Sequence, residues 1–309
     1  MNGLELSRAF YEAHGKPMLA AQFPRLLPYL AVGLFGSGSE CLGYDDAVSR
    51  DHDFEPGFCI LLPDEETVDR RSEFLLERAY AKLPKRFDGV ERAALAPVGG
   101  ARHGVRRTAE FFTQTVGSPD GRLTAAQWLA LPEQALLEAT DGAVFFDDWG
   151  EVSRIRETLA YFPEDVRRKR LAGQLLLAGQ AGQYNHARCL AHGEDAAARL
   201  AAGEFVRAAL SAAFLLERRY QPYYKWSFRA LRSLPRGAVL AEPLASLLGA
   251  ADGAAAQDVI EQASGTLSDL LRTEGLSALP ENELERHAYA VNERIADAAL
   301  RNLHVLAAV

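Results

Sequence analysis

Apolar residues in the first part of the chain form two short runs, at residues 30–35 and 58–62. Runs of this length, bounded by turn-forming residues, predict buried strands. We expect the second strand to begin before its apolar run, near Asp53, and to end at Leu62. Upstream, residues 4–21 place apolar side chains at helical spacing, which predicts an amphipathic helix.

Later segments mix strand and helix patterns up to about residue 150 and are helical beyond it. Helices are expected from residue 66 to about Tyr80, over 108–116 and over 128–139, and strands over 103–107 and 143–146. From residue 153 the chain is rich in alanine and leucine at helical spacing. The pattern predicts an α+β protein with an N-terminal mixed α/β domain, residues 1–150, and a C-terminal all-helical domain, residues 151–309.

The connection between the two predicted strands contains the residues that most clearly indicate a chemical function. The first strand leads into Gly36-Ser37-Gly38-Ser39, whose backbone N–H groups suit an anion such as a phosphate. Asp51 and Asp53 follow, and alternation along a strand directs both carboxylates to the same face. Side by side they repel each other, and a divalent cation relieves that repulsion. Either feature alone also fits a structural turn or a solvated strand edge; together they predict phosphoryl or nucleotidyl transfer.

This order of strand, Gly-Ser turn, Ser49, Asp51-x-Asp53 and strand resembles the polymerase-β-like nucleotidyltransferase superfamily. Within it, the layout is most similar to the small-molecule enzymes typified by kanamycin nucleotidyltransferase. The whole chain is also similar to a bacterial family of uncharacterised function in that superfamily, through its Gly-Ser-Glu-Cys, Arg-Asp-His-Asp-Phe, Gln-Tyr-Asn and Tyr-Tyr-Lys-Trp stretches. One departure is that Arg50 separates Ser49 from Asp51, where serine commonly adjoins the first aspartate.

The resemblance implies a catalytic α/β domain followed by a helical substrate-binding domain. It also implies transfer of a nucleoside monophosphate, by default AMP from ATP, onto a hydroxyl of a small-molecule acceptor. Asp51 and Asp53 would be catalytic and would hold Mg²⁺. Gly38, Ser39 and Ser49 would bind the triphosphate.

A third carboxylate from a neighbouring strand usually completes such a site, and here the residues leave it open. The position implied by the kanamycin-type layout falls near Arg106, which is basic. Glu110 is the nearest carboxylate, and Asp147, at the end of the last strand of the domain, is the other candidate. If neither serves, the protein uses one metal, takes its base from the helical domain, or binds nucleotide without transferring it.

Two polar runs stand out in the predicted helical domain. Tyr184, Asn185 and Arg188 share one face of a helix otherwise full of alanine and leucine, and Lys225 lies among aromatic residues. Rings suit base stacking and cations suit phosphate contact. The resemblance favours Lys225 and Arg188 as phosphate ligands, and we also predict that Tyr184 and Asn185 bind nucleotide. The alternative is that the aromatic residues form interdomain core while Lys225 reaches solvent.

Composition narrows the class of partner. The formal net charge of −8 argues against duplex nucleic acid, whose binders usually carry a basic face. We interpret the basic run at residues 167–170 as a solvated helix end, and His186, His192 and His287 as ordinary structural residues. No apolar run approaches the ~20 residues of a membrane span. Three cysteines without metal spacing, and the lack of a signal peptide, predict a cytoplasmic protein.

Two other classes of function stay open. One is a nucleotide-binding protein without transfer activity, which the unassigned third carboxylate favours. The other is an antitoxin-like or regulatory partner, for which an acidic helical surface is sufficient.

Overall fold

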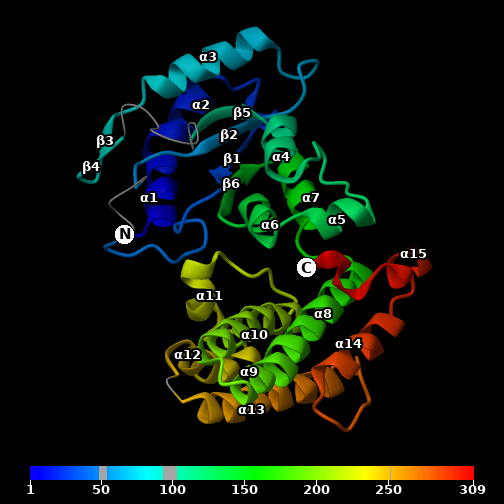
Figure 1. Ribbon diagram of the computed structural model, residues 1–309. Helices are drawn as coiled ribbons and strands as arrows, with labels where there is room; N and C mark the ends of the chain where they lie inside the picture. The colour runs from blue at the N-terminus through cyan, green and yellow to red at the C-terminus, as the bar shows by residue number, and fades with distance from the viewer. Residues whose placement is uncertain (49–53, 93–102, 251) are drawn as a thin grey trace. The chain divides into compact units, whose positions relative to one another are not determined.

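The computed structural model describes residues 1–48, 54–92, 103–250 and 252–309 (Figure 1). They form an α+β protein, as predicted, with a small mixed sheet and a largely helical C-terminal part. The chain divides into two compact units, here called the sheet unit (Met1–Leu123 with Ala135–Ala160) and the helical unit (Thr124–Gln134 with Tyr161–Val309). The sequence predicts a single boundary at residue 150. In the structure the sheet unit extends to Ala160, and the earlier segment Thr124–Gln134 belongs to the helical unit.

The sheet unit begins with helical segments that follow one another without a break: α1 (Gly3–Phe10), the π-helix η1 (Tyr11–Gly15) and α2 (Lys16–Gln22). Asn2 and Glu5 form a capping box that fixes the start of α1. The remaining elements are β1 (Ala31–Leu34), β2 (Cys59–Leu62), α3 (Arg70–Ala81), β3 (Arg86–Phe87), β4 (Val90–Glu91), β5 (Gly104–Arg107), α4 (Thr108–Val116), α6 (Glu133–Thr140), β6 (Ala143–Asp147) and α7 (Glu151–Thr158).

The four main strands form a sheet in the order β5-β2-β1-β6. Strand β1 is antiparallel to both its neighbours, and β2 is parallel to β5. Gly33 pairs with Cys59, Cys59 with Gly104, and Leu34 with Ala143. The end of β1 therefore shares one edge of the sheet with the starts of β2, β5 and β6. We call this the turn edge, because the Gly-Ser turn begins there.

The two central strands of the sheet, β1 and β2, are buried on both faces. On one face, Val32, Ile60 and Leu62 are fully buried in a core that includes residues of α1, α2 and α3. At the turn edge, Phe35 contacts the Phe111 ring of α4, with centroids 6.2 Å apart, and the Arg156 guanidinium of α7, 5.2 Å from its ring centre. These contacts hold the end of β1 between packed helices, so the turn that follows starts from a rigid base.

The helical unit is built around α10 (Asp195–Leu216), on which Phe205, Ala209 and Ala213 are fully buried at helical spacing. Helix α8 (Glu164–Ala178) continues through the π-helix η4 (Gly179–His186) into α9 (Ala187–Ala191). The others are α5 (Ala125–Ala130), α11 (Tyr224–Leu231), α12 (Ala241–Gly249), α13 (Gly253–Thr273), α14 (Leu284–Glu293) and α15 (Ala298–Asn302), with short 3-10 turns between some of them (Figure 1).

The basic run at residues 167–170 is not a solvated helix end, so that prediction is wrong. It lies inside α8, where Arg167 and Lys169 have no exposed surface. Arg167 forms an ion pair with Glu164 at 2.7 Å, and Lys169 Nζ donates to the Leu303 carbonyl at 2.6 Å. Buried cations persist only where such partners replace water. The run therefore joins parts of the helical unit rather than facing solvent.

Among the residues that the structure describes, no helix has the combined length and apolar character needed to cross a bilayer. All three cysteines are free.

Candidate functional site at the turn edge

The Gly-Ser turn leaves β1 in a conformation that requires glycine. Gly36 has a φ of +99° and Gly38 a φ of +129°, a region that other residues rarely adopt. The Gly36 N–H donates to the Glu138 carbonyl at 3.1 Å, and the Tyr44 N–H donates to the Ser39 carbonyl at 2.8 Å. Gly38 and Ser39 are both half-buried. The two predicted phosphate-binding residues thus lie in a tight, backbone-braced turn.

The rest of this loop is anchored to the N-terminal helix. Asp45 accepts a hydrogen bond from the Gly3 N–H at 2.7 Å, at the start of α1. This contact satisfies one of the free N–H groups of the helix and places negative charge at its positive end. The acidic residues after the turn are therefore partly structural.

The prediction that the second strand begins near Asp53 is wrong, because β2 begins at Cys59. Residues 54–58 approach the sheet as irregular backbone, and Pro56 has no N–H to donate to a strand ladder. The Gly57 carbonyl accepts from Ser7 Oγ at 2.6 Å, and the Phe58 N–H donates to the Tyr80 hydroxyl at 3.1 Å. This stretch is thus held by α1 and α3, and it enters the sheet at the turn edge.

Asp51, Asp53 and Ser49 lie outside the described residues. Within the described ranges, which omit 49–53, 93–102 and 251, no cluster of three or more His, Cys, Asp or Glu side chains is arranged to hold a metal ion. The assignment of Mg²⁺ to Asp51 and Asp53 stays a prediction. Carboxylate oxygens are the ligands that Mg²⁺ prefers, so the chemistry of this pair fits the ion.

A hydrogen-bonded pair of side chains that the sequence patterns did not single out lies at the turn edge. His103, just before β5, has its Nδ1 3.1 Å from Glu55 Oε1, and both side chains are largely buried. They line a small hollow together with Ser7, Leu34 and Glu40. The signal in the sequence is the continued alternation of Asp51, Asp53 and Glu55, which places a third acid on the same segment.

The two candidates for a third carboxylate are attached to the opposite edge of the sheet. Glu110 is exposed in the first turn of α4, which starts where β5 ends. Asp147 ends β6, and its register partner is Ala31, at the far end of β1 from the Gly-Ser turn. The Asp147 carboxylate accepts hydrogen bonds from the Ser153 N–H and hydroxyl, at 2.8 and 2.7 Å. Asp147 therefore already stabilises the start of α7.

Three predicted nucleotide-binding residues are exposed in neighbouring segments of the helical unit. Tyr184 and Asn185 belong to the π-helix η4, and Arg188 to α9. All three are exposed, and the Arg188 guanidinium lies 5.2 Å from the centre of the Tyr184 ring. Tyr184 and Arg188 are thus brought together as the sequence spacing predicts, although the segment is a π-helix rather than a regular α-helix.

Lys225, the fourth, is exposed in the first turn of α11. Its Nζ lies 5.0 Å from the Trp226 ring centre, and the neighbouring Tyr223 and Tyr224 rings contact each other at an interplanar angle of 44°, with centroids 4.2 Å apart. Tyr224 is 76% exposed. Lys225, Tyr184, Asn185 and Arg188 belong to the helical unit, whereas Gly38 and Ser39 belong to the sheet unit. The role of all four in binding nucleotide stays a prediction.

The family described as "Domain of unknown function (DUF4037)" matches residues 128–227, about a third of the chain. The matched part runs from Trp128 in α5 to Ser227 in α11 and includes Tyr184, Arg188 and Lys225. It does not include the Gly-Ser turn or the Asp51–Asp53 pair. A search of curated proteins finds no match to the sequence.

Proposed function

We propose that this protein is a metal-dependent nucleotidyltransferase whose reaction centre lies at the turn edge of the sheet. It would move a nucleoside monophosphate, AMP by default, from the triphosphate onto a hydroxyl of a small-molecule acceptor. Asp51 and Asp53 would hold Mg²⁺, and the turn at Gly38 and Ser39 would bind the β- and γ-phosphates. The nucleotide and the reaction type rest on the superfamily resemblance.

The observation that carries this proposal is the strand register. Because Gly33 pairs with Cys59, the Gly-Ser turn leaves the sheet at the edge where the chain coming from Asp53 enters it. Only five residues lie between Asp53 and Cys59, so the two halves of the sequence motif are tethered to one short stretch of the sheet. Motif halves on opposite edges would have argued against a shared site.

The chemistry follows from the groups available. When bound, Mg²⁺ would neutralise charge on the triphosphate next to the attacked phosphorus. The turn would contribute backbone N–H groups, which bind phosphate without needing a charged side chain. Phosphoryl-type transfer depends mostly on such positioning and charge stabilisation.

A second candidate function is nucleotide binding without transfer. It is favoured by the attachment of both Glu110 and Asp147 to the opposite edge of the sheet, which leaves the third carboxylate of a two-metal site unassigned. Glu55 at the turn edge is the described acid best placed to fill that gap, but it is already paired with His103.

Binding of ATP, measured calorimetrically with and without Mg²⁺, tests the proposal. We expect Mg²⁺-dependent binding that is abolished when Asp51 and Asp53 are both changed to Asn, because a neutral amide loses most of the charge attraction. Asp46→Asn is the matched control. It removes one negative charge from the same acidic loop, and an amide oxygen can still accept from the Val48 N–H.

The results of these measurements distinguish the three classes of function considered for this protein. Retained binding in the double variant, or equal loss in the control, contradicts the metal assignment. No binding of ATP by the native chain favours the antitoxin-like class instead. Pyrophosphate release in the presence of a panel of hydroxyl acceptors then distinguishes a transferase from a nucleotide-binding protein.

A further inference from the structure

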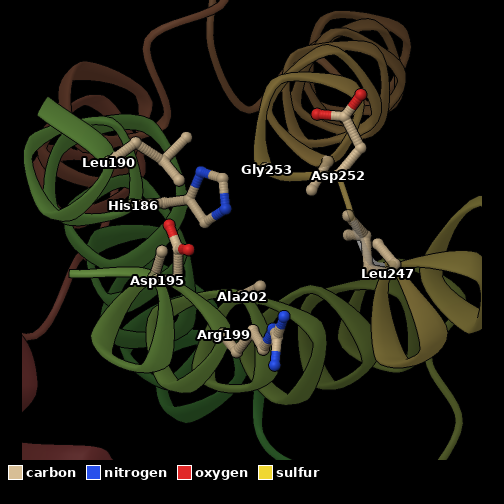
Figure 2. Close-up of a pocket in the computed structure, with 11 residues that line it drawn as sticks. His186, Leu190, Asp195, Arg199, Ala202, Leu247, Asp252 and Gly253 are labelled. Atoms are coloured by element: carbon tan, nitrogen blue, oxygen red, sulfur yellow. The ribbon is translucent and has the colours of Figure 1, made fainter. Parts of the chain in front are cut away.

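The helical unit contains a cavity of about 200 Å³ that the proposed function does not use. Side chains from η4, α9, α10 and α12, and the residues at the start of α13, line it (Figure 2). Its walls are mixed: Leu190, Leu247 and Ala202 are apolar, whereas His186, Asp195 and Asp252 are polar. A concave space with apolar walls and a few converging polar groups is typical of a small-molecule site.

His186 projects into this cavity from η4 with only 2% of its surface exposed (Figure 2). Close packing under η4 holds it there: a Cβ at Gly182 would lie 2.4 Å from the Phe205 ring, so only glycine allows this approach to α10. The buried ring makes one hydrogen bond, between Nδ1 and Gln257 Oε1 at 2.6 Å. Its other nitrogen, Nε2, has no hydrogen-bond partner among the described residues.

The neighbours of His186 determine which nitrogen carries the proton. The Gln257 amide nitrogen donates to Glu261 Oε1 at 3.0 Å, so its oxygen is left to accept from the imidazole. Gln183 donates to the other oxygen of the Glu261 carboxylate at 2.9 Å and holds it in place. These hydrogen bonds favour the neutral tautomer that carries its proton on Nδ1, and in that tautomer Nε2 presents a lone pair to the cavity.

The charged lining is acidic on balance. Asp195, in the first turn of α10, and Asp252, the N-cap of α13, contribute carboxylates, and Arg199 contributes the one cation of the lining. Asp252 accepts from the Ala254 N–H at 2.9 Å, so its charge already occupies the helix end that would otherwise attract an anion. Figure 2 shows Asp195 beside His186, on the side of the cavity opposite Asp252.

We propose that this cavity binds a small organic cation, a primary ammonium carried on a compact apolar body. The ammonium has three N–H donors and no acceptor. His186 Nε2 and the Asp195 carboxylate would accept two of them, and Leu190 and Leu247 would contact the apolar part. The proposal does not depend on nucleotidyl transfer, and its failure would leave the proposed function intact.

Three probes of the same shape test the assignment: cyclohexylammonium, cyclohexanol and cyclohexanecarboxylate. The full-length chain, labelled with ¹⁵N-histidine, is titrated with each, and the His186 imidazole resonances are assigned with His186→Gln. We expect saturable shifts of His186 with cyclohexylammonium and much weaker effects with the other two probes. Stronger binding of the carboxylate, or the same response to all three, overturns the proposal, as does no saturable shift with cyclohexylammonium.

Three substitutions refine the test. Asp195→Asn should weaken cyclohexylammonium binding about tenfold, the size of one charge-assisted hydrogen bond. Asp258→Asn removes an exposed charge from α13 outside the cavity lining and should leave binding unchanged. Equal weakening in both variants would show a general charge effect and overturn the site. Gln257→Leu should change the tautomer signature of His186 and weaken binding of the cation as well.

Discussion

At the scale of single residues, the Glu133 carboxyl of the helical unit has a pKa well above its ordinary value. Burial raises its pKa to about 7, although the Gln221 N–H donates to its carboxylate and Arg170 is near. A raised pKa means that folding favours the protonated carboxyl. This stabilisation is fully present below the ordinary value of 4.5 and is lost as the pH rises through 7.

Replacing Glu133 with Gln keeps the shape of the side chain and removes its ionisation. Relative to the native chain, we expect the free energy of unfolding of the variant to increase by roughly 3 kcal/mol between about pH 4 and about pH 8. Urea unfolding at the two pH values, followed by tryptophan fluorescence, measures it, because Trp128 lies in the same unit. A difference between variant and native chain that is equal at both pH values would contradict this assignment.

At the scale of elements, hydrogen bonds from buried cations hold α8 against other parts of the helical unit. Lys169 Nζ donates to Asn292 Oδ1 of α14 at 2.9 Å and to the Leu303 carbonyl beyond α15 at 2.6 Å. Arg168, its neighbour, pairs with Glu164 and Asp165 at 3.2 and 3.1 Å but is partly exposed. Water screens such exposed pairs, whereas it cannot replace the partners of Lys169.

Lys169→Met should therefore lower the free energy of unfolding by about 2–4 kcal/mol, since it leaves buried acceptors without a donor. Arg168→Met, one position earlier on the same helix, should lower it by about 1 kcal/mol or less. Chemical denaturation of the two variants and the native chain measures both effects. Equal losses would mean that Lys169 contributes no more than a solvated charge.

At the scale of the whole molecule, the segment Thr124–Gln134 belongs with helices that follow it by some thirty residues or more. Arg170 donates to the carbonyls of Trp128 and Leu129 at 3.1 and 2.9 Å, which satisfies the end of α5. The Trp128 ring packs edge-on against Phe162, with centroids 5.8 Å apart. The helical unit is therefore incomplete without α5.

A fragment of residues 124–309 should consequently unfold cooperatively and at a higher temperature than a fragment of residues 151–309. The shorter fragment lacks Trp128, whose burial is worth about 3–5 kcal/mol, and leaves Arg170 without its carbonyl partners. Circular dichroism during heating compares the two. Identical midpoints would show that α5 is not part of the folding unit.

Local patterns in the sequence predicted much of the secondary structure. The helix expected over 108–116 matches α4, and the glycines of the Gly-Ser turn have the positive φ angles that such a turn requires. These features depend on residues a few positions apart, so one segment contains their cause. The start of β2 was misplaced because Pro56 and the contacts of Gly57 and Phe58 with α1 and α3 outweighed the alternation of the segment.

Only the tertiary structure decided which polar groups are buried and what they meet. The pairs Glu55–His103, His186–Gln257 and Lys169–Asn292 are separated by 48, 71 and 123 positions, so nothing in the segment of one partner indicates the other. The order of amino acids was by itself enough to predict a glycine turn after the first strand and two carboxylates ahead of the second. Whether a cation faces water or a carbonyl depends on how distant segments pack, because removing water from a charge requires partners that no single stretch of sequence provides.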